Sequence, residues 1–220
     1  MANNPNQFIV GDRLLTEQDA IVACLRACGL AAINSLVDVN NRSAQMAAGN
    51  LYTHDIVEQT KGWSWNMAYN VALSPDVNGL ITLPDNLLWF TPTQENFSEN
   101  TTYRTSYQLA ARGDRLYNVS VNTFVFSTPV SLDLCTRQPW DNLPPAYRVY
   151  ITAKAAKDLN ASTLRSASVE RSMNELIATS LVALEQVENK YQKANPKGNR
   201  GQVYRRLHGR GGRRRNRAIR

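Results

Sequence analysis

The sequence predicts an α+β protein: a four-helix bundle, made by one helix pair near each end of the chain, with an inserted antiparallel β-sandwich or barrel domain. Three observations predict it. Apolar residues recur at helical spacing in residues 16–59 and 145–193. Every second residue is large and apolar in the stretch that begins at Trp63. Residues after Asn195 are rich in arginine and glycine, which predicts a basic C-terminal tail outside the fold.

The first helix pair is predicted in residues 16–59. Thr16 precedes the acidic residues Glu17 and Asp19, which is typical of a capped helix start, and Gly29 ends this helix. A second helix is expected at about 41–59. The residues of this helix expected to face the protein core are Ala44, Ala47, Ala48, Leu51 and Val57.

The spacing of large residues changes at Gly62. Six of them then alternate with smaller or polar residues, which predicts a strand with one buried face. These six are Trp63, Trp65, Met67, Tyr69, Val71 and Leu73. Further strands are expected at 80–83, 87–90, 103–111, 115–119 and 121–134. The two tryptophans would also suit a carbohydrate platform, but their alternation favours the core.

The second helix pair follows Pro144 and Pro145, since proline suits the first turn of a helix. Its first helix carries apolar residues at helical spacing: Leu143, Tyr147, Tyr150, Ile151, Ala155 and Leu159. A last helix is expected over 166–193, with an apolar stripe from Val169 to Tyr191.

The order of these elements predicts a division of the chain. Isolated helices are marginal in water, so residues 1–61 and 137–195 are expected to pack together as one helical bundle. Residues 62–136 would then be an inserted β domain, because closing a longer loop adds little entropic cost. Residues 196–220 would be an Arg/Gly-rich extended tail. No run of 18 apolar residues occurs, so no membrane span is expected.

The net charge of +7 is unevenly distributed. Residues 197–220 contain ten basic residues and no acid, whereas residues 1–196 contain 15 basic and 18 acidic residues, a net charge of −3. We expect the tail to be disordered on its own. Its arginines suit a solubilising end, sequence-independent contact with nucleic acid, or ordering against an acidic partner protein.

The sequence shows no assembled catalytic or metal motif. There is no Gly-rich phosphate loop and no His-Glu-x-x-His helix, and the only histidines are His54 and His208. Glu95 and Glu99 could be imagined as a glycosidase pair, but their polar loop favours solvated surface. Three cysteines, Cys24, Cys28 and Cys135, are interpreted as buried free thiols. No cofactor is therefore expected.

Three pieces of sequence carry a family resemblance. They are Gly62-Trp63-x-Trp65-Asn66, then Leu73-Ser-Pro75-Asp76, then Asp141-Asn-Leu143-Pro144-x-x-Tyr147-Arg148-x-Tyr150-Ile151-x-x-Lys154-Ala155. In order and spacing they resemble tail tubular protein A of short-tailed bacteriophages of the autographivirus type, over roughly residues 15–190. The motif residues taken as structural are Gly62, Trp63, Trp65, Asn66, Pro75, Asp76, Pro144, Tyr147, Arg148, Tyr150 and Lys154.

The resemblance implies a non-enzymatic head-to-tail adaptor in the virion tail, made in the host cytoplasm. It implies a dodecameric ring between the portal protein and a tail nozzle of the tail tubular protein B type, which lines the channel for DNA ejection. The arginine-rich end is not inherited from the family, so its role as a portal or DNA interface is a hypothesis. That interface would consist of Arg200, Arg205, Arg206, Arg210, Arg213, Arg214, Arg215, Arg217 and Arg220.

Two other function classes stay open. A nucleic-acid-binding viral capsid protein with a disordered basic arm would have a jelly roll of about eight strands and few long helices. A tail-associated polysaccharide hydrolase would need two carboxylates that converge in a cleft.

Overall fold

The computed structural model describes residues 16–30, 41–93 and 108–194. Within these ranges it contains four α-helices and small antiparallel sheets, which confirms the α+β class. The loop 94–107 and the arginine-rich tail lie outside the described residues, so the predictions for them stay predictions.

Both helices of the first pair begin at a capping residue, and the first of these, Thr16, is as predicted. Helix α1 is Glu17–Ala27, and a capping box links the side chains of Thr16 and Asp19 to each other's backbone N–H groups. Helix α2 is Arg42–Gln59, and the Asn41 side chain caps it by accepting from the backbone N–H of Ala44 (3.1 Å).

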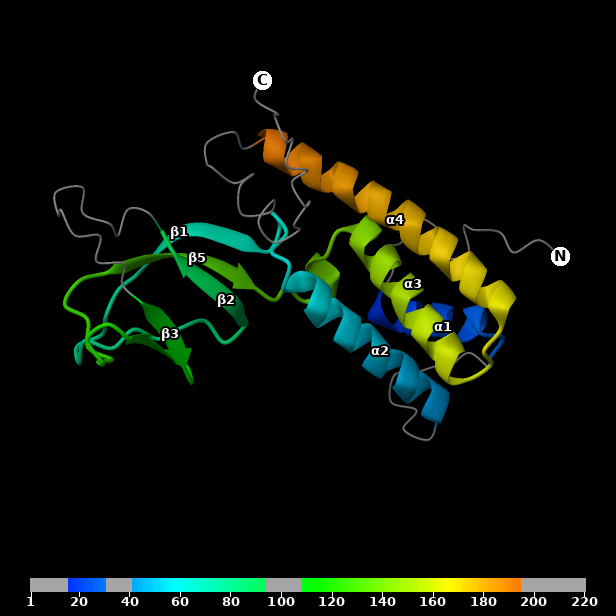
Figure 1. Ribbon diagram of the computed structural model, residues 1–220, viewed down its shortest axis with the longest axis horizontal. Coiled ribbons are helices and arrows are strands. Elements are labelled where there is room, and N and C mark those ends of the chain that lie inside the picture. Colours follow the sequence, from blue (N-terminus) through cyan, green and yellow to red (C-terminus); the bar gives the residue numbers. More distant parts are fainter. Residues whose placement is uncertain (1–15, 31–40, 94–107, 195–220) are drawn as a thin grey trace, which may run out of the picture.

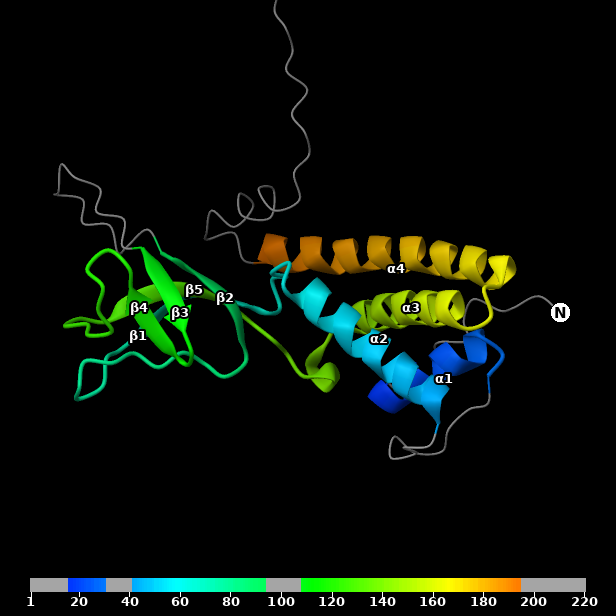
Figure 2. The ribbon, with the colours of Figure 1, turned by 60° about the horizontal axis from the view of Figure 1, so that its bottom comes forward.

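The second helix pair consists of α3, Pro145–Ser162, and α4, Ala167–Ala194. Pro145 occupies the first turn of α3, where no backbone N–H is needed. Helix α3 lies at the centre of the helical part and contacts α1, α2 and α4, whereas α4 packs chiefly on α3 (Figures 1 and 2). The other three helices therefore surround α3, which makes the most contacts between helices.

One hydrophobic core joins all four helices. The central part comes from α3, with Tyr147, Ile151, Ala155 and Leu159 at no measurable exposure. Leu25 of α1, Leu51 of α2 and Leu184 of α4 pack against it. The prediction that Val57 and Tyr191 face the core is wrong, because their exposed fractions are 53% and 48%.

The larger sheet has three strands in the order β1-β5-β2: Met67–Leu73, Val130–Thr136 and Leu87–Pro92. Both outer strands run antiparallel to β5. Alternation along β1 is as predicted, since its odd-numbered residues are partly buried and its even-numbered residues exposed. A register shift between Ala68 and Val71 surrounds Asn70, which has a positive φ of 53°.

A separate hairpin pairs β3, Leu109–Arg112, with β4, Arg115–Asn118. The predicted barrel is wrong, because the described strands form two small sheets that do not close. Residues 80–83 and 121–129 make isolated bridges, such as Leu80 with Val125, instead of the predicted strands. Alternation predicts a buried face but does not determine which strand pairs with it.

A second hydrophobic core lies under the strands and is built from Ile81, Leu83, Leu116, Leu132 and Leu134. It is distinct from the core of the helices, and the strands lie at one end of the molecule with the helices at the other (Figures 1 and 2). The division into domains at residues 61, 136 and 195 stays a prediction.

Candidate assembly site at the junction of helices and sheet

The chain crosses twice between the helices and the three-stranded sheet. It leaves α2 through residues 60–66 and enters β1, and it returns from β5 through residues 137–144 to α3. The short 3-10 helix η2, Trp140–Asn142, lies on the return crossing. Polar side chains that would be costly to bury alone meet at these crossings.

Gln59 connects the end of α2 to the return crossing. Its side-chain oxygen accepts from the backbone N–H of Gln138 (2.7 Å), and its amide nitrogen donates to the Gln138 carbonyl (3.0 Å). The same nitrogen donates to Asp55 Oδ1 (2.8 Å). Gln59 is fully buried, so these bonds fix the end of the sheet against α2 without competition from water.

Glu58 is a buried carboxylate held by two lysines. Lys154 Nζ of α3 lies 2.6 Å from Oε1, and Lys61 Nζ lies 2.5 Å from Oε2. Burial acts to raise the pKa of Glu58, but the hydrogen bonds and charges of the two lysines outweigh it, and the net pKa is lowered. The charged carboxylate therefore ties α2 to α3.

Asp55 completes the polar face of α2. Tyr147 donates its hydroxyl to the Asp55 carbonyl (2.9 Å), and Arg137 Nη2 lies 3.3 Å from Asp55 Oδ2. Burial raises the pKa of Tyr147, so it remains a neutral donor. The guanidinium of Arg137 also lies over the ring of Tyr52, 4.7 Å from its centroid.

The first family motif, at residues 62–66, forms the outgoing crossing. Gly62 has φ +75°, and a Cβ at this position would lie 2.8 Å from the Trp89 ring. The Trp63 ring packs in the helical core and donates Nε1 to the Glu58 carbonyl (3.0 Å). Trp65 packs edge-on against Tyr147, with ring centroids 5.0 Å apart. Both tryptophans precede β1, so their predicted place in the strand is wrong, while the core interpretation is confirmed for Trp63.

Asn66 ends this crossing and is also buried. Its amide donates to the Gln59 carbonyl (2.8 Å), and its own carbonyl accepts from the backbone N–H of Thr136 in β5 (2.9 Å). The Glu188 carboxylate of α4 accepts from the hydroxyl of Ser64 (2.7 Å) and from its backbone N–H. The crossing is therefore bonded to α2, α4 and β5 together.

The other motif residues stabilise turns and helix starts. The Asp76 carboxylate, next to Pro75, accepts from the backbone N–H groups of Asn78 (2.8 Å) and Leu80 (2.9 Å). Pro144 caps α3. Buried Arg148 donates to the carbonyls of Leu143 (3.0 Å) and Asp141 (2.6 Å), which holds η2 against α3. Tyr150 and Lys154 both contact Glu58.

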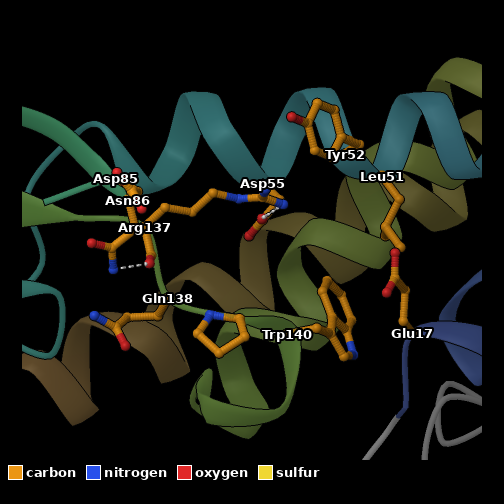
Figure 3. A pocket seen from close by; sticks show the side chains of 10 residues that line it. Glu17, Leu51, Tyr52, Asp55, Asp85, Asn86, Arg137, Gln138 and Trp140 are labelled. Atoms are coloured by element: carbon orange, nitrogen blue, oxygen red, sulfur yellow. Dashed lines mark hydrogen bonds and ion pairs between the residues drawn. The ribbon is translucent and has the colours of Figure 1, made fainter. Parts of the chain in front are cut away.

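A cleft of about 570 Å³ opens beside the junction (Figure 3). Its lining residues are Glu17, Leu51, Tyr52, Asp55, Asp85, Asn86, Arg137, Gln138, Pro139 and Trp140. In Figure 3, Arg137 extends across the cleft to Asp55, and Trp140 lies on the opposite side from Tyr52.

The residues considered for chemistry do not converge where the structure describes them. His54 pairs with Asp158 (2.7 Å) between α2 and α3, and Glu95 and Glu99 lie outside the described residues. The three cysteines are buried free thiols, as predicted, and burial raises the pKa of Cys135 to about 12. In residues 16–30, 41–93 and 108–194, no group of three or more His, Cys, Asp or Glu side chains could hold a metal ion.

Sequence reasoning missed the polar half of the junction, namely Asp55, Glu58, Gln59, Arg137 and Gln138. A signal existed for the first three, because the stripe Ala44, Ala47 and Leu51 continues at helical spacing onto Asp55, Glu58 and Gln59. Their partners on α3 and the return crossing could not be read from spacing. All nine predicted interface arginines of the tail lie outside the described residues.

The junction fixes the helical part of the molecule against the three-stranded sheet. The model of the tail tubular protein family matches residues 18–194, so the chain belongs to this family, and the predicted resemblance is confirmed. It is a structural component of a phage tail and assembles with other tail components. A search of curated proteins finds no match. No helix among the described residues is long and apolar enough to cross a membrane.

Proposed function

We propose that this chain is the head-to-tail adaptor subunit, which forms a dodecameric ring between the portal and the tail nozzle and lines the channel through which DNA is ejected. Family membership supports the location in the tail. The observation that carries the proposal further is the buried junction, in which Gln59 and Asn66 fix the helices to the sheet and Glu58 ties α2 to α3.

A ring adaptor needs this kind of rigidity. Ring subunits join head to tail, so each must present two different surfaces at a constant angle, and it must present others above and below. Parts that are already ordered lose little conformational entropy on assembly. The helices at one end and the sheet at the other supply unlike surfaces for a neighbour, the portal and the nozzle (Figure 1).

Within this proposal the arginine-rich tail contacts the portal or the DNA. Ten basic residues in each of the twelve subunits would concentrate positive charge around one axis, where it attracts an acidic portal face or phosphate groups without reading sequence. The fold gives no support to the capsid alternative, since helices as long as the 28-residue α4 are foreign to a jelly roll.

An order-of-addition experiment tests the adaptor function. Purified portal, this chain and the nozzle protein are mixed pairwise and together, and complexes are separated by sedimentation. We expect the chain to bind the portal, and the nozzle to join the portal only when the chain is present. A nozzle that binds the portal equally well without the chain would rule out the adaptor role.

Deletion of residues 197–220 tests the role of the tail. The truncated chain should keep its fold, which circular dichroism checks, because the described cores contain none of these residues. Docking to the portal should weaken by about tenfold and become less sensitive to salt, since counterion release is lost. Undiminished docking would exclude the tail from the portal interface.

A further inference from the structure

The cleft beside the junction carries negative charge that the described residues do not neutralise. Arg137 is matched by Asp55, 3.3 Å away. Two other lining carboxylates, Glu17 and Asp85, are exposed and make no ion pair with any residue that the structure describes. The cleft therefore has two carboxylates available to a cationic ligand.

The walls of the cleft suit an arginine in particular. Tyr52 and Trp140 line it on opposite sides (Figure 3), and planar guanidinium groups stack on aromatic rings. The Arg137 guanidinium already lies over Tyr52. A volume of about 570 Å³ falls within the range of about 300–1,000 Å³ that is common for binding clefts.

We propose that this cleft binds the arginine-rich segment 197–220 of the same chain in the free subunit. Charge complementarity identifies this occupant: the segment has ten basic residues and no acid, while the rest of the chain has a net charge of −3. Arginine side chains pair with Glu17 and Asp85 and stack on the aromatic walls.

The connection between α4 and the cleft permits this arrangement. Near its end, α4 contacts the outgoing crossing, where Glu188 accepts a hydrogen bond from Ser64. Gln59, just before this crossing, bonds to Gln138, which lines the cleft. The 26 residues after Ala194 reach at most about 94 Å when extended. Because segment and cleft belong to one chain, their effective concentration is high.

This binding is separate from the adaptor role. In the free subunit the cleft shields a segment that would otherwise attract any polyanion, and on assembly a more acidic portal face or DNA competes for the same arginines. The adaptor can function without this contact, and the contact can form without a ring.

Limited proteolysis of the full-length chain tests the proposal, because trypsin cuts after arginine only where the backbone is accessible. We expect release of peptides from 197–220 to be about fivefold faster in the double variant E17Q/D85N than in the natural chain. The matched control E175Q/E185Q removes two exposed carboxylates of α4 and should leave the rate unchanged. Circular dichroism and melting temperature establish that all three proteins are folded.

Salt and dilution complete the test. About 0.5 M NaCl should abolish the difference between the natural chain and E17Q/D85N, because it screens exposed charges. Equal rates at low salt, or the same acceleration in E175Q/E185Q, would overturn the proposal. Protection that disappears on dilution would place the segment in another copy and overturn the same-chain assignment. Sedimentation of each variant with the portal reports the adaptor function independently.

Discussion

Single buried residues decide how the helices meet one another and the sheet. Glu58 is 1% exposed, and its charge is tolerated because Lys154 and Lys61 contact both carboxylate oxygens. Since the folded pKa is lowered, the stabilisation is complete above the ordinary glutamate pKa of 4.5 and is lost as pH falls through the lower folded value.

Substitution of Glu58 by glutamine should lower the free energy of unfolding by about 2 kcal/mol at neutral pH, because both lysine ion pairs are removed. The difference between E58Q and the natural chain should stay constant from about pH 8 to pH 6 and shrink below pH 4.5. Urea unfolding at each pH measures it. A difference that grows toward low pH would contradict the assigned ion pairs.

Two glycines should respond in opposite directions to alanine. At Gly62 the positive φ and the contact of 2.8 Å with Trp89 predict destabilisation of about 1–3 kcal/mol. Gly49 lies inside α2, and a Cβ at this position would have no neighbour within 4 Å, so G49A should stabilise by about 0.5–1 kcal/mol. Thermal unfolding compares the two variants, and an equal effect of both would contradict the local geometry.

At the scale of elements, local patterns predicted the helices better than the sheets. The caps at Thr16 and Asn41 and the proline at the start of α3 depend on a few neighbouring residues, so they can be read from the sequence. Strand pairing depends on distant residues: β5 pairs with β1 and β2, and residues 121–129 form turns, bends and isolated bridges although they are rich in β-forming residues. The Gln59–Gln138 pair joins positions 79 residues apart.

Gln59 tests how α2 is attached to the sheet. Replacement by leucine keeps the volume but leaves the backbone groups of Gln138 unpaired, so the free energy of unfolding should fall by about 2–3 kcal/mol. Amide hydrogen exchange at Gln138 should accelerate at the same time. Q186L, at an exposed position of α4, is the control and should have little effect on either measurement.

At the scale of the whole molecule, two cores joined by a polar junction give one building block with unlike ends. The class and the family could be predicted from the sequence, because periodicity and three motif pieces are local. The division of the strands into two open sheets could not be predicted from the sequence, because alternation does not define which strand edges pair. The junction was found only in the structure, because buried polar partners are contributed by distant segments.

Native mass spectrometry of the chain, alone and with purified portal, tests the central claim most directly. If the block is an adaptor subunit, complexes with the portal should contain twelve chains of 24.6 kDa and no intermediate number as the dominant species. A chain that remains monomeric at saturating portal concentration, or that binds the portal in a variable number of copies, would contradict the account.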